Sequence, residues 1–268
     1  MVVGFIGCGN MGSAILEGII NSRLVGPKYI AVSDQNGDRV EELKNKYKVM
    51  GSTDNTKTAH DSDILFLCVK PNQLNEVIEK IKDKVKPDVV IVSIVAGRSI
   101  ADIREAFGKE VNVIRVMPNT PALVGEAMCA LSLCEKVKKK EYEKQISLIQ
   151  NIFNGLGKCA IVPEEMMDAV TAVSGSSPAY VFMFIEAMAD AAVRAGMTRK
   201  TAYIFAAQAV YGSAKMILET HKHPGQLKDM VCQPGGTTLE AIRVLESHKL
   251  RSSIFEAMKA CVVHAKKM

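Results

Sequence analysis

The stretch GFIGCGNMG, from Gly4 to Gly12, decides how the first part of the chain folds. It continues the apolar run Val2–Ile6 and leads into an amphipathic helical pattern. A Gly-x-Gly-x-x-Gly motif in this strand–loop–helix order is typical of dinucleotide binding. Gly7 permits the tight turn, Gly9 lets the backbone approach a pyrophosphate, and Gly12 lets helix and sheet pack closely. We therefore expect an anion at the N-terminus of the helix.

Apolar runs alternate with helical patterns through the first part of the chain, and this alternation predicts βαβ units and a parallel sheet. The runs expected as further strands are Tyr29–Ser33, Asp63–Val69, Asp88–Val95, Val111–Val116 and Ala127–Leu133. Helices are expected over Ile15–Ile20 and Asp38–Tyr47. We predict an α/β Rossmann-like, dinucleotide-binding domain over residues 1–162.

The pattern becomes purely helical from Met166 onward. The expected helices are Pro178–Arg194, Thr198–Glu219, Thr237–Leu250 and Ser253–Lys267. The first of them is apolar on nearly every face and must be buried, but about a hundred residues are few for enclosing such a helix. We predict an all-helical substrate and dimerisation domain over residues 163–268, and a homodimer formed through it.

Composition excludes several classes of protein. Lysine and arginine total 34 and acidic residues 29, a net charge of +5 without a basic stripe that interleaves aromatics, so no nucleic-acid partner is expected. Seven scattered cysteines form no Cys-x-x-Cys pair, which predicts no metal site and a reducing, cytoplasmic location. Charged residues interrupt the apolar stretches, so we expect a soluble chain without a membrane span.

Several loops leave the carboxyl ends of the expected strands, the edge where such sheets bind ligands. Asp34 follows the second strand, where an acid would hold a ribose 2′-hydroxyl or simply cap the next helix. Ser33 and Arg39 suit a 2′-phosphate instead, so NAD and NADP both stay open. Small Ala96 and Gly97 would let a nicotinamide ring lie flat against the backbone.

Two glycine- and hydroxyl-containing stretches in the helical half suggest a carboxylate site. In PGGTTLEAI, Thr237 fits the N-cap and Glu240 the N3 position of a capping box. Thr238 would then have a free hydroxyl beside the unpaired N–H groups of the first turn. In SGSSPAY, Ser174 and Ser176 precede a helix expected to open at Pro178.

Seven motifs resemble those of the pyrroline-5-carboxylate reductase family. They are GFIGCGNMGSAI, LCVKP, SIVAG, VMPNTPALVGEA, DAVTAVSGSSPAY, HPGQLKDMV and PGGTTLEAI, in order from end to end of the chain. The resemblance implies a Rossmann domain, an all-helical dimerisation domain and dimers that often form decamers. It also implies that NADPH, less often NADH, reduces the C=N bond of 1-pyrroline-5-carboxylate to give L-proline.

The resemblance also assigns residues. The cofactor set is Ile6, Gly7, Cys8, Gly9, Asn10, Met11, Gly12, Ser33, Asn55, Val69, Lys70, Pro71, Ala96, Gly97, Asn119 and Glu164. The substrate set is Ser174, Gly175, Ser176, Gln233, Pro234, Gly235, Gly236, Thr237 and Thr238, with Thr238 expected to hydrogen-bond the imine nitrogen. Two positions depart from the family pattern, since Ser177 replaces a glycine and Gln233 replaces a serine.

Other functions fit parts of the sequence. A β-hydroxyacid dehydrogenase or imine reductase shares this domain plan, but the first needs a catalytic lysine, and Lys215 and Lys228 have no supporting motif. A nucleotide-sensing scaffold or a protein that handles pyridoxal phosphate would not need the Pro-Gly-Gly-Thr-Thr loop. His221 and His223 are more typical of helix ends than of a proton relay.

Overall fold

The computed structural model describes residues 1–267 and contains one eight-stranded sheet. The strands are β1 (Val3–Ile6), β2 (Ile30–Ser33), β3 (Met50–Ser52), β4 (Ile64–Leu67), β5 (Val90–Ser93), β6 (Asn112–Met117), β7 (Ala127–Leu133) and β8 (Gly157–Ile161). Their order across the sheet is β3-β2-β1-β4-β5-β6-β7-β8. The first six strands thus have the order of a dinucleotide-binding sheet, with its switch point between β1 and β4.

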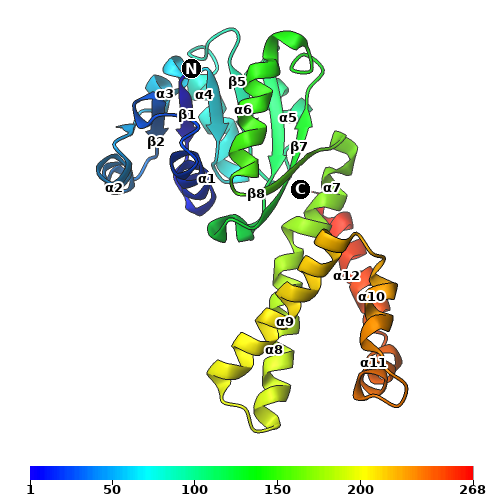
Figure 1. Ribbon diagram of the computed structural model, residues 1–268. Coiled ribbons are helices and arrows are strands. Elements are labelled where there is room, and N and C mark those ends of the chain that lie inside the picture. The colour runs from blue at the N-terminus through cyan, green and yellow to red at the C-terminus, as the bar shows by residue number, and fades with distance from the viewer. Residues whose placement is uncertain (268) are drawn as a thin grey trace. The chain divides into compact units, whose positions relative to one another are not determined.

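Helices enclose this sheet (Figure 1). They are α1 (Asn10–Asn21), α2 (Gly37–Tyr47), α3 (Asn55–Asp61), α4 (Leu74–Ile81), α5 (Ile100–Phe107) and α6 (Glu143–Asn154). Every residue of β1, β2, β4 and β5 is buried, so these strands are covered on both faces. The expected Rossmann-like α/β fold is confirmed.

The strand pattern predicts a parallel sheet, but one pair of strands in the structure is antiparallel. β7 runs antiparallel to β6, with Val116 paired to Leu131. The connection between them holds only the short 3₁₀ helix Thr120–Val124, and a parallel crossover needs a dozen or more residues. Two strands, β3 and β8, were not expected, because each is short and only partly buried.

An aromatic stack lies at the centre of the core. The rings of Phe5 on β1 and Phe66 on β4 are stacked with their centroids 4.7 Å apart, and Phe66 also meets Phe153 of α6 at 6.2 Å. All three side chains are fully buried. The stack joins the two strands that flank the switch point.

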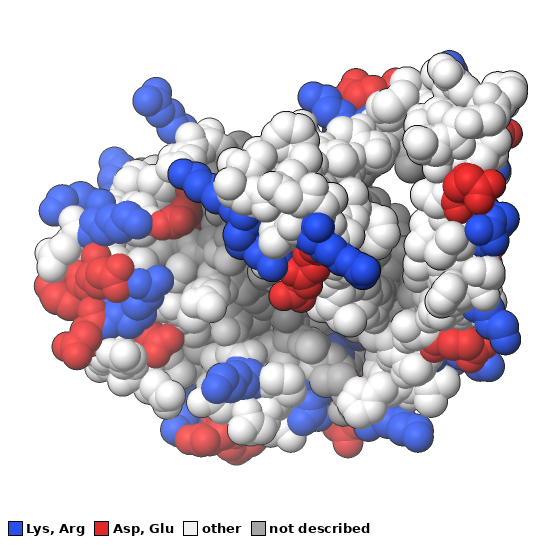
Figure 2. Space-filling model, turned by 90° about the horizontal axis from the view of Figure 1, so that it is seen from below, with Lys and Arg blue, Asp and Glu red and all other residues white. Residues whose placement is uncertain are grey.

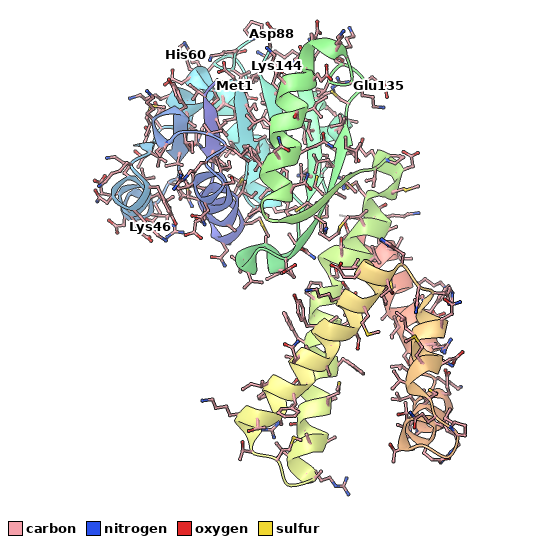
Figure 3. All side chains as sticks on the ribbon, in the orientation of Figure 1. Met1, Lys46, His60, Asp88, Glu135 and Lys144 are labelled. Carbon is pink, nitrogen blue, oxygen red and sulfur yellow. The ribbon has the colours of Figure 1, made fainter. Side chains whose placement is uncertain are left out.

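The ends of the sheet differ in what they carry. Figure 3 places Met1, Asp88 and Glu135 near the end where the parallel strands begin. The loops that carry the cofactor motifs leave the opposite, carboxyl edge. Figure 2 shows basic and acidic side chains interspersed on the face seen from below.

Contacts within the chain define a second unit, Ser176–Cys261, beside a first that comprises Met1–Gly175 and the chain end from Val262. Its helices are α8 (Ser177–Arg194), α9 (Arg199–Thr220), α10 (Pro224–Val231), α11 (Thr237–Ser247) and most of α12 (Leu250–Ala265). A short helix, α7 (Met167–Val170), precedes it. No helix in the described part of the chain is long and apolar enough to span a membrane.

The second unit buries little of its apolar surface. The buried residues of its own small core are Ala189, Ala202 and Ala206, where α8 packs against α9. Large apolar side chains on the same helices are exposed, including Phe182 at 61%, Phe205 at 62% and Leu218 at 63%. α8 was expected to be buried, and within one copy of the chain it is not.

Candidate active site

The loop between β1 and α1 is shaped by close backbone contacts. Gly7 has a φ of +95° and donates its N–H to the Ser33 carbonyl at 2.8 Å. A Cβ on Gly12 would lie 2.5 Å from the Gly7 carbonyl oxygen, so only glycine fits there. A Cβ on Gly9, which has an ordinary φ of −67°, would meet no atom within 4 Å. Gly9 is the position at which the loop backbone stays open to a ligand.

Two charged side chains hold the Cys8 peptide in this loop. The Asp34 carboxylate accepts the Cys8 N–H at 2.7 Å, and the Arg39 Nε donates to the Cys8 carbonyl at 3.2 Å. Arg39 also donates to the Ser13 hydroxyl at 2.8 Å. Asp34 is not the cap of α2, because Asn36 accepts the N–H groups of the first turn. No motif in the sequence predicts that Asp34 and Arg39 hold the loop in this way.

A pocket of about 230 Å³ lies at the switch point. The ends of β1, β2 and β4 line it together with residues of α3 and α4. The lining residues are Ile6, Gly7, Gly9, Asp34, Gln35, Asn55, Cys68, Val69, Lys70, Gln73 and Val77. Six residues of the predicted cofactor set are therefore brought together here. Gln73 belongs to the predicted loop that follows β4, whereas Gln35, Cys68 and Val77 were not assigned to the cofactor beforehand.

Ser33 is placed differently from the prediction. Its side chain is fully buried, and its hydroxyl donates to the Phe5 carbonyl at 3.3 Å. This placement argues against a contact between the Ser33 hydroxyl and a cofactor phosphate. The alternation of the strand explains it, because Ser33 is the last residue of β2 and still lies within the sheet.

The predicted nicotinamide loop follows β5. Gly97 adopts a φ of +69°, and Ser99 forms a capping box with Asp102 at the start of α5. Glu164 accepts the Ile100 N–H at 2.7 Å and pairs with Arg115 at 3.2 Å. Glu164 thus anchors the helix that follows Ala96 and Gly97. Arg115 was not singled out, although a lone arginine within the apolar run Val111–Val116 was a usable signal.

Asn119 joins two backbone segments. Its Nδ2 donates to the Ser174 carbonyl at 3.0 Å, and its Oδ1 accepts the Met128 N–H at 3.0 Å. Its side chain is nearly buried, at 9% exposure. Both ends of the Asn119 amide are committed to the protein, so it positions the end of β6 next to the segment that contains Ser174.

Thiols near the glycine loop are not nucleophiles. Burial raises the pKa of the Cys8 thiol to about 12, and the charge of Asp34 adds to the effect. Burial also raises the pKa of Cys68 strongly. Both thiols stay protonated at neutral pH, so they offer small neutral packing groups to the pocket. Within residues 1–267, no group of three or more metal-ligating side chains is close enough to hold an ion.

The SGSSPAY segment is helical, not a loop that opens a helix at Pro178. α7 continues through a π-helical turn, Thr171–Gly175, into α8, which begins at Ser177. The Ser174 hydroxyl donates to the Val170 carbonyl at 3.0 Å. Ser176 lies in the second unit, where its hydroxyl is 3.3 Å from the Cys261 sulfur. π-Helical turns are frequent at functional sites.

The Pro-Gly-Gly-Thr-Thr loop lies in the second unit, and the capping-box prediction was wrong. Gly236 is the N-cap of α11, its φ of −79° and ψ of 156° are extended, and no described side chain caps it. Gly235 makes the turn with a φ of +70°. Thr237 and Thr238 are therefore the first two residues of the helix, and Glu240 pairs with Arg243 at 3.0 Å. A glycine cap leaves the first-turn N–H groups available.

The histidine prediction is confirmed. His221 ends α9 in the left-handed conformation, and His223 caps α10 by accepting the Gly225 N–H at 3.1 Å. The two side chains serve adjacent helix ends.

Comparisons with known proteins agree with this geometry. Residues 164–268 match the family described as pyrroline-5-carboxylate reductase dimerisation, and residues 2–97 match NADP oxidoreductase coenzyme F420-dependent. A pyrroline-5-carboxylate reductase of Escherichia coli is 47% identical over 99% of this chain and 97% of its own length. The chain belongs to the pyrroline-5-carboxylate reductase family. A pyrroline-5-carboxylate reductase of Methanosarcina acetivorans is 41% identical over 96% of this chain and 93% of its own length.

Solved structures of the family have the same fold. A pyrroline-5-carboxylate reductase from Coxiella burnetii superposes with a TM-score of 0.91 at 36% identity, covering 99% of this chain and 97% of that one. The Plasmodium falciparum enzyme, solved with NADP bound, gives a TM-score of 0.88 at 30% identity, over 100% and 97%. The similarity includes the second unit as well as the sheet.

The pocket fits a dinucleotide on its own geometry. Asn55 Oδ1 is buried and has no hydrogen-bond partner among residues 1–267, so a ligand that brings a donor would satisfy it. The open side of Gly9 leaves room for a pyrophosphate beside the N-terminus of α1.

We predict that Gly9→Val abolishes dinucleotide binding and leaves the fold intact, because its Cβ has space in the protein and would occupy the ligand's place. Calorimetry with NADP⁺, after circular dichroism has verified folding, measures this. Gly26→Val is a matched control, since Gly26 also has a φ of −67° and lies outside the pocket. Undiminished binding by Gly9→Val would mean that the glycine loop is only a turn.

Proposed function

We propose that this chain reduces 1-pyrroline-5-carboxylate to L-proline with NADPH, or with NADH, in the last step of proline biosynthesis. The observation that carries the proposal is the end-to-end relationship to pyrroline-5-carboxylate reductases, which includes both the glycine loop and the Pro-Gly-Gly-Thr-Thr loop. A nucleotide sensor would need the first loop but not the second. Residues 1–162 would bind the dinucleotide, and residues 163–268 would provide substrate contacts and dimerisation.

The protein's task in this reaction is to orient two small groups. When bound, the nicotinamide cofactor supplies a hydride to the imine carbon of the substrate. Ile6–Gly12, with Asn55 and Val69–Pro71, would hold the dinucleotide at the switch point. Ala96 and Gly97, on the loop anchored by Glu164, would support the nicotinamide. Positioning of this kind accounts for much of the rate in hydride transfer between bound partners.

Substrate binding is assigned to two segments, the π-helical turn that leads into α8 and the start of α11. The first turn of α11, capped by Gly236, offers free N–H groups and the positive end of the helix dipole to a carboxylate. Gln233–Thr238 would form this loop, and Ser174–Ser176 would also contact the substrate. Thr238 would accept a hydrogen bond from the protonated imine nitrogen, which favours the iminium form that receives hydride.

The assembly is proposed to be a homodimer formed through the helical half, with five dimers in a decamer, in the cytoplasm and without membrane or nucleic-acid partners. The exposed apolar side chains of α8, α9 and α12 support dimer formation through these helices. One example is Phe255 on α12, which is 72% exposed. Surfaces of this kind mark interfaces.

A direct assay tests the activity. Purified protein mixed with NADPH and 1-pyrroline-5-carboxylate should oxidise NADPH, with L-proline as the product in equal amount. Omission of the imino acid is the control. Absence of turnover by folded protein that binds NADPH would contradict the proposal and favour a nucleotide-binding scaffold.

The two neighbouring threonines should differ in their effects. Thr238→Ala should lower catalytic efficiency roughly ten- to a thousandfold, the scale of one preorganised hydrogen bond, with cofactor binding unchanged. Thr237→Ala is the matched control. Gly236, and not Thr237, caps α11. The free energy of unfolding of the Thr237→Ala variant should therefore differ from that of the wild type by less than about 0.5 kcal/mol. Steady-state kinetics and thermal melts measure both, and wild-type efficiency in Thr238→Ala would exclude its assigned role.

The oligomer prediction concerns α9. Wild-type protein should sediment as a dimer or a larger assembly at micromolar concentration. Phe205→Glu should shift it toward monomer, because a charge would be buried in the proposed interface. Lys138→Glu, on the first unit, is the control. An active wild-type monomer at that concentration would rule out an obligate dimer.

A further inference from the structure

The pocket is lined by an acidic residue, Asp34, at the end of β2. A 2′-phosphate bound there would need a cation instead. Asp34 follows β2, the position from which an acid contacts an adenosine ribose. Its two carboxylate oxygens accept the N–H groups of Cys8 and Asn36, at 2.7 and 2.9 Å. These bonds fix the carboxylate at the wall of the pocket, of which it is a lining residue.

Arg39 is the cation that the sequence offers for a 2′-phosphate, and its guanidinium is already engaged. Its Nε and one terminal nitrogen donate to the Cys8 carbonyl and the Ser13 hydroxyl, at 3.2 and 2.8 Å. The other terminal nitrogen pairs with Glu42 at 2.5 Å. Arg39 is hydrogen-bonded to the loop and is absent from the lining of the pocket.

The other charged residue among the described lining residues is Lys70. It follows β4, which is separated from β2 by β1, so the two strand ends lie about 10 Å apart. Lys70 is thus on the side of the pocket away from the adenosine ribose. Asn55 Oδ1 also lines this pocket and is an acceptor that has no partner within residues 1–267. Acceptors suit the hydroxyl donors of a ribose, whereas a phosphate monoester brings a charge of about −1.5 to −2.

We infer that Asp34 is a specificity-determining residue, which lowers affinity for 2′-phosphorylated dinucleotides and admits NADH to the same site as NADPH. This inference rests on the proposed function for its biological meaning. Its physical basis is the carboxylate fixed in the lining of the pocket and the engagement of the Arg39 guanidinium with Cys8, Ser13 and Glu42.

The test measures binding without substrate. We expect Asp34→Asn to increase affinity for NADP⁺ relative to NAD⁺ by roughly tenfold, as expected when a like charge a few ångströms away is removed. Calorimetric titration of each dinucleotide gives the two Kd values. Asp38→Asn is the matched control, because Asp38 is an exposed acid of the same segment outside the pocket, and its Kd ratio should not change. Equal weakening of both dinucleotides by Asp34→Asn would reduce Asp34 to a clamp on the loop and overturn the inference.

Two further measurements keep the test decisive if Asp34→Asn folds poorly. In the wild-type protein, added salt should weaken NADP⁺ binding no more than NAD⁺ binding, because it screens the repulsion from Asp34. A steeper loss for NADP⁺ would indicate a cationic phosphate site and overturn the inference. Arg39→Gln should weaken both dinucleotides alike, and a loss confined to NADP⁺ would assign Arg39 to the phosphate. Turnover of 1-pyrroline-5-carboxylate by the wild-type protein separately tests the proposed function, so failure of one is distinct from failure of the other.

Discussion

The close approach of three backbone segments at the end of β1 is the constraint on which the rest of the structure depends. A Cβ at Gly7 would lie 2.6 Å from the Cys68 carbonyl oxygen, and one at Gly12 would lie 2.5 Å from the carbonyl oxygen of Gly7. Without side chains at these positions, α1 starts directly beside the ends of β1 and β4. This contact aims the N-terminus of α1 at the switch point, where a pyrophosphate is stabilised. The pocket is therefore a consequence of packing that glycine alone permits.

Many of the polar residues assigned to ligands hold the ligand-binding loops instead of facing the pocket. Ser33 is buried against the Phe5 carbonyl, Asn119 bridges Ser174 and Met128, and Glu164 anchors the start of α5. This division suits hydride transfer, in which the protein must hold two reactants in place and the cofactor supplies the reactive bond.

The two units are stabilised by different means. The first encloses the Phe5, Phe66 and Phe153 stack and buries whole strands on both faces. The second buries three alanines and exposes large apolar side chains along α8 and α9. Burial of apolar surface is the main favourable contribution to folding. The second unit therefore needs further apolar contacts, and the family match to a dimerisation domain over residues 164–268 indicates their source.

The sequence by itself determined six of the strands, their alternation with helices, the glycine loop, the helical second half and the family. These features are local or periodic. A motif such as GFIGCGNMG by itself predicts a strand, a tight turn and the start of a helix. Only the tertiary structure decided which side chains face a ligand. The direction of β7, the glycine cap of α11 and the engagement of Arg39 with Cys8 and Ser13 all depend on partners chosen among nearby alternatives. The β7 pairing and the Arg39 contacts join segments distant in sequence, and the α11 cap is a choice among neighbouring residues that the local pattern leaves open.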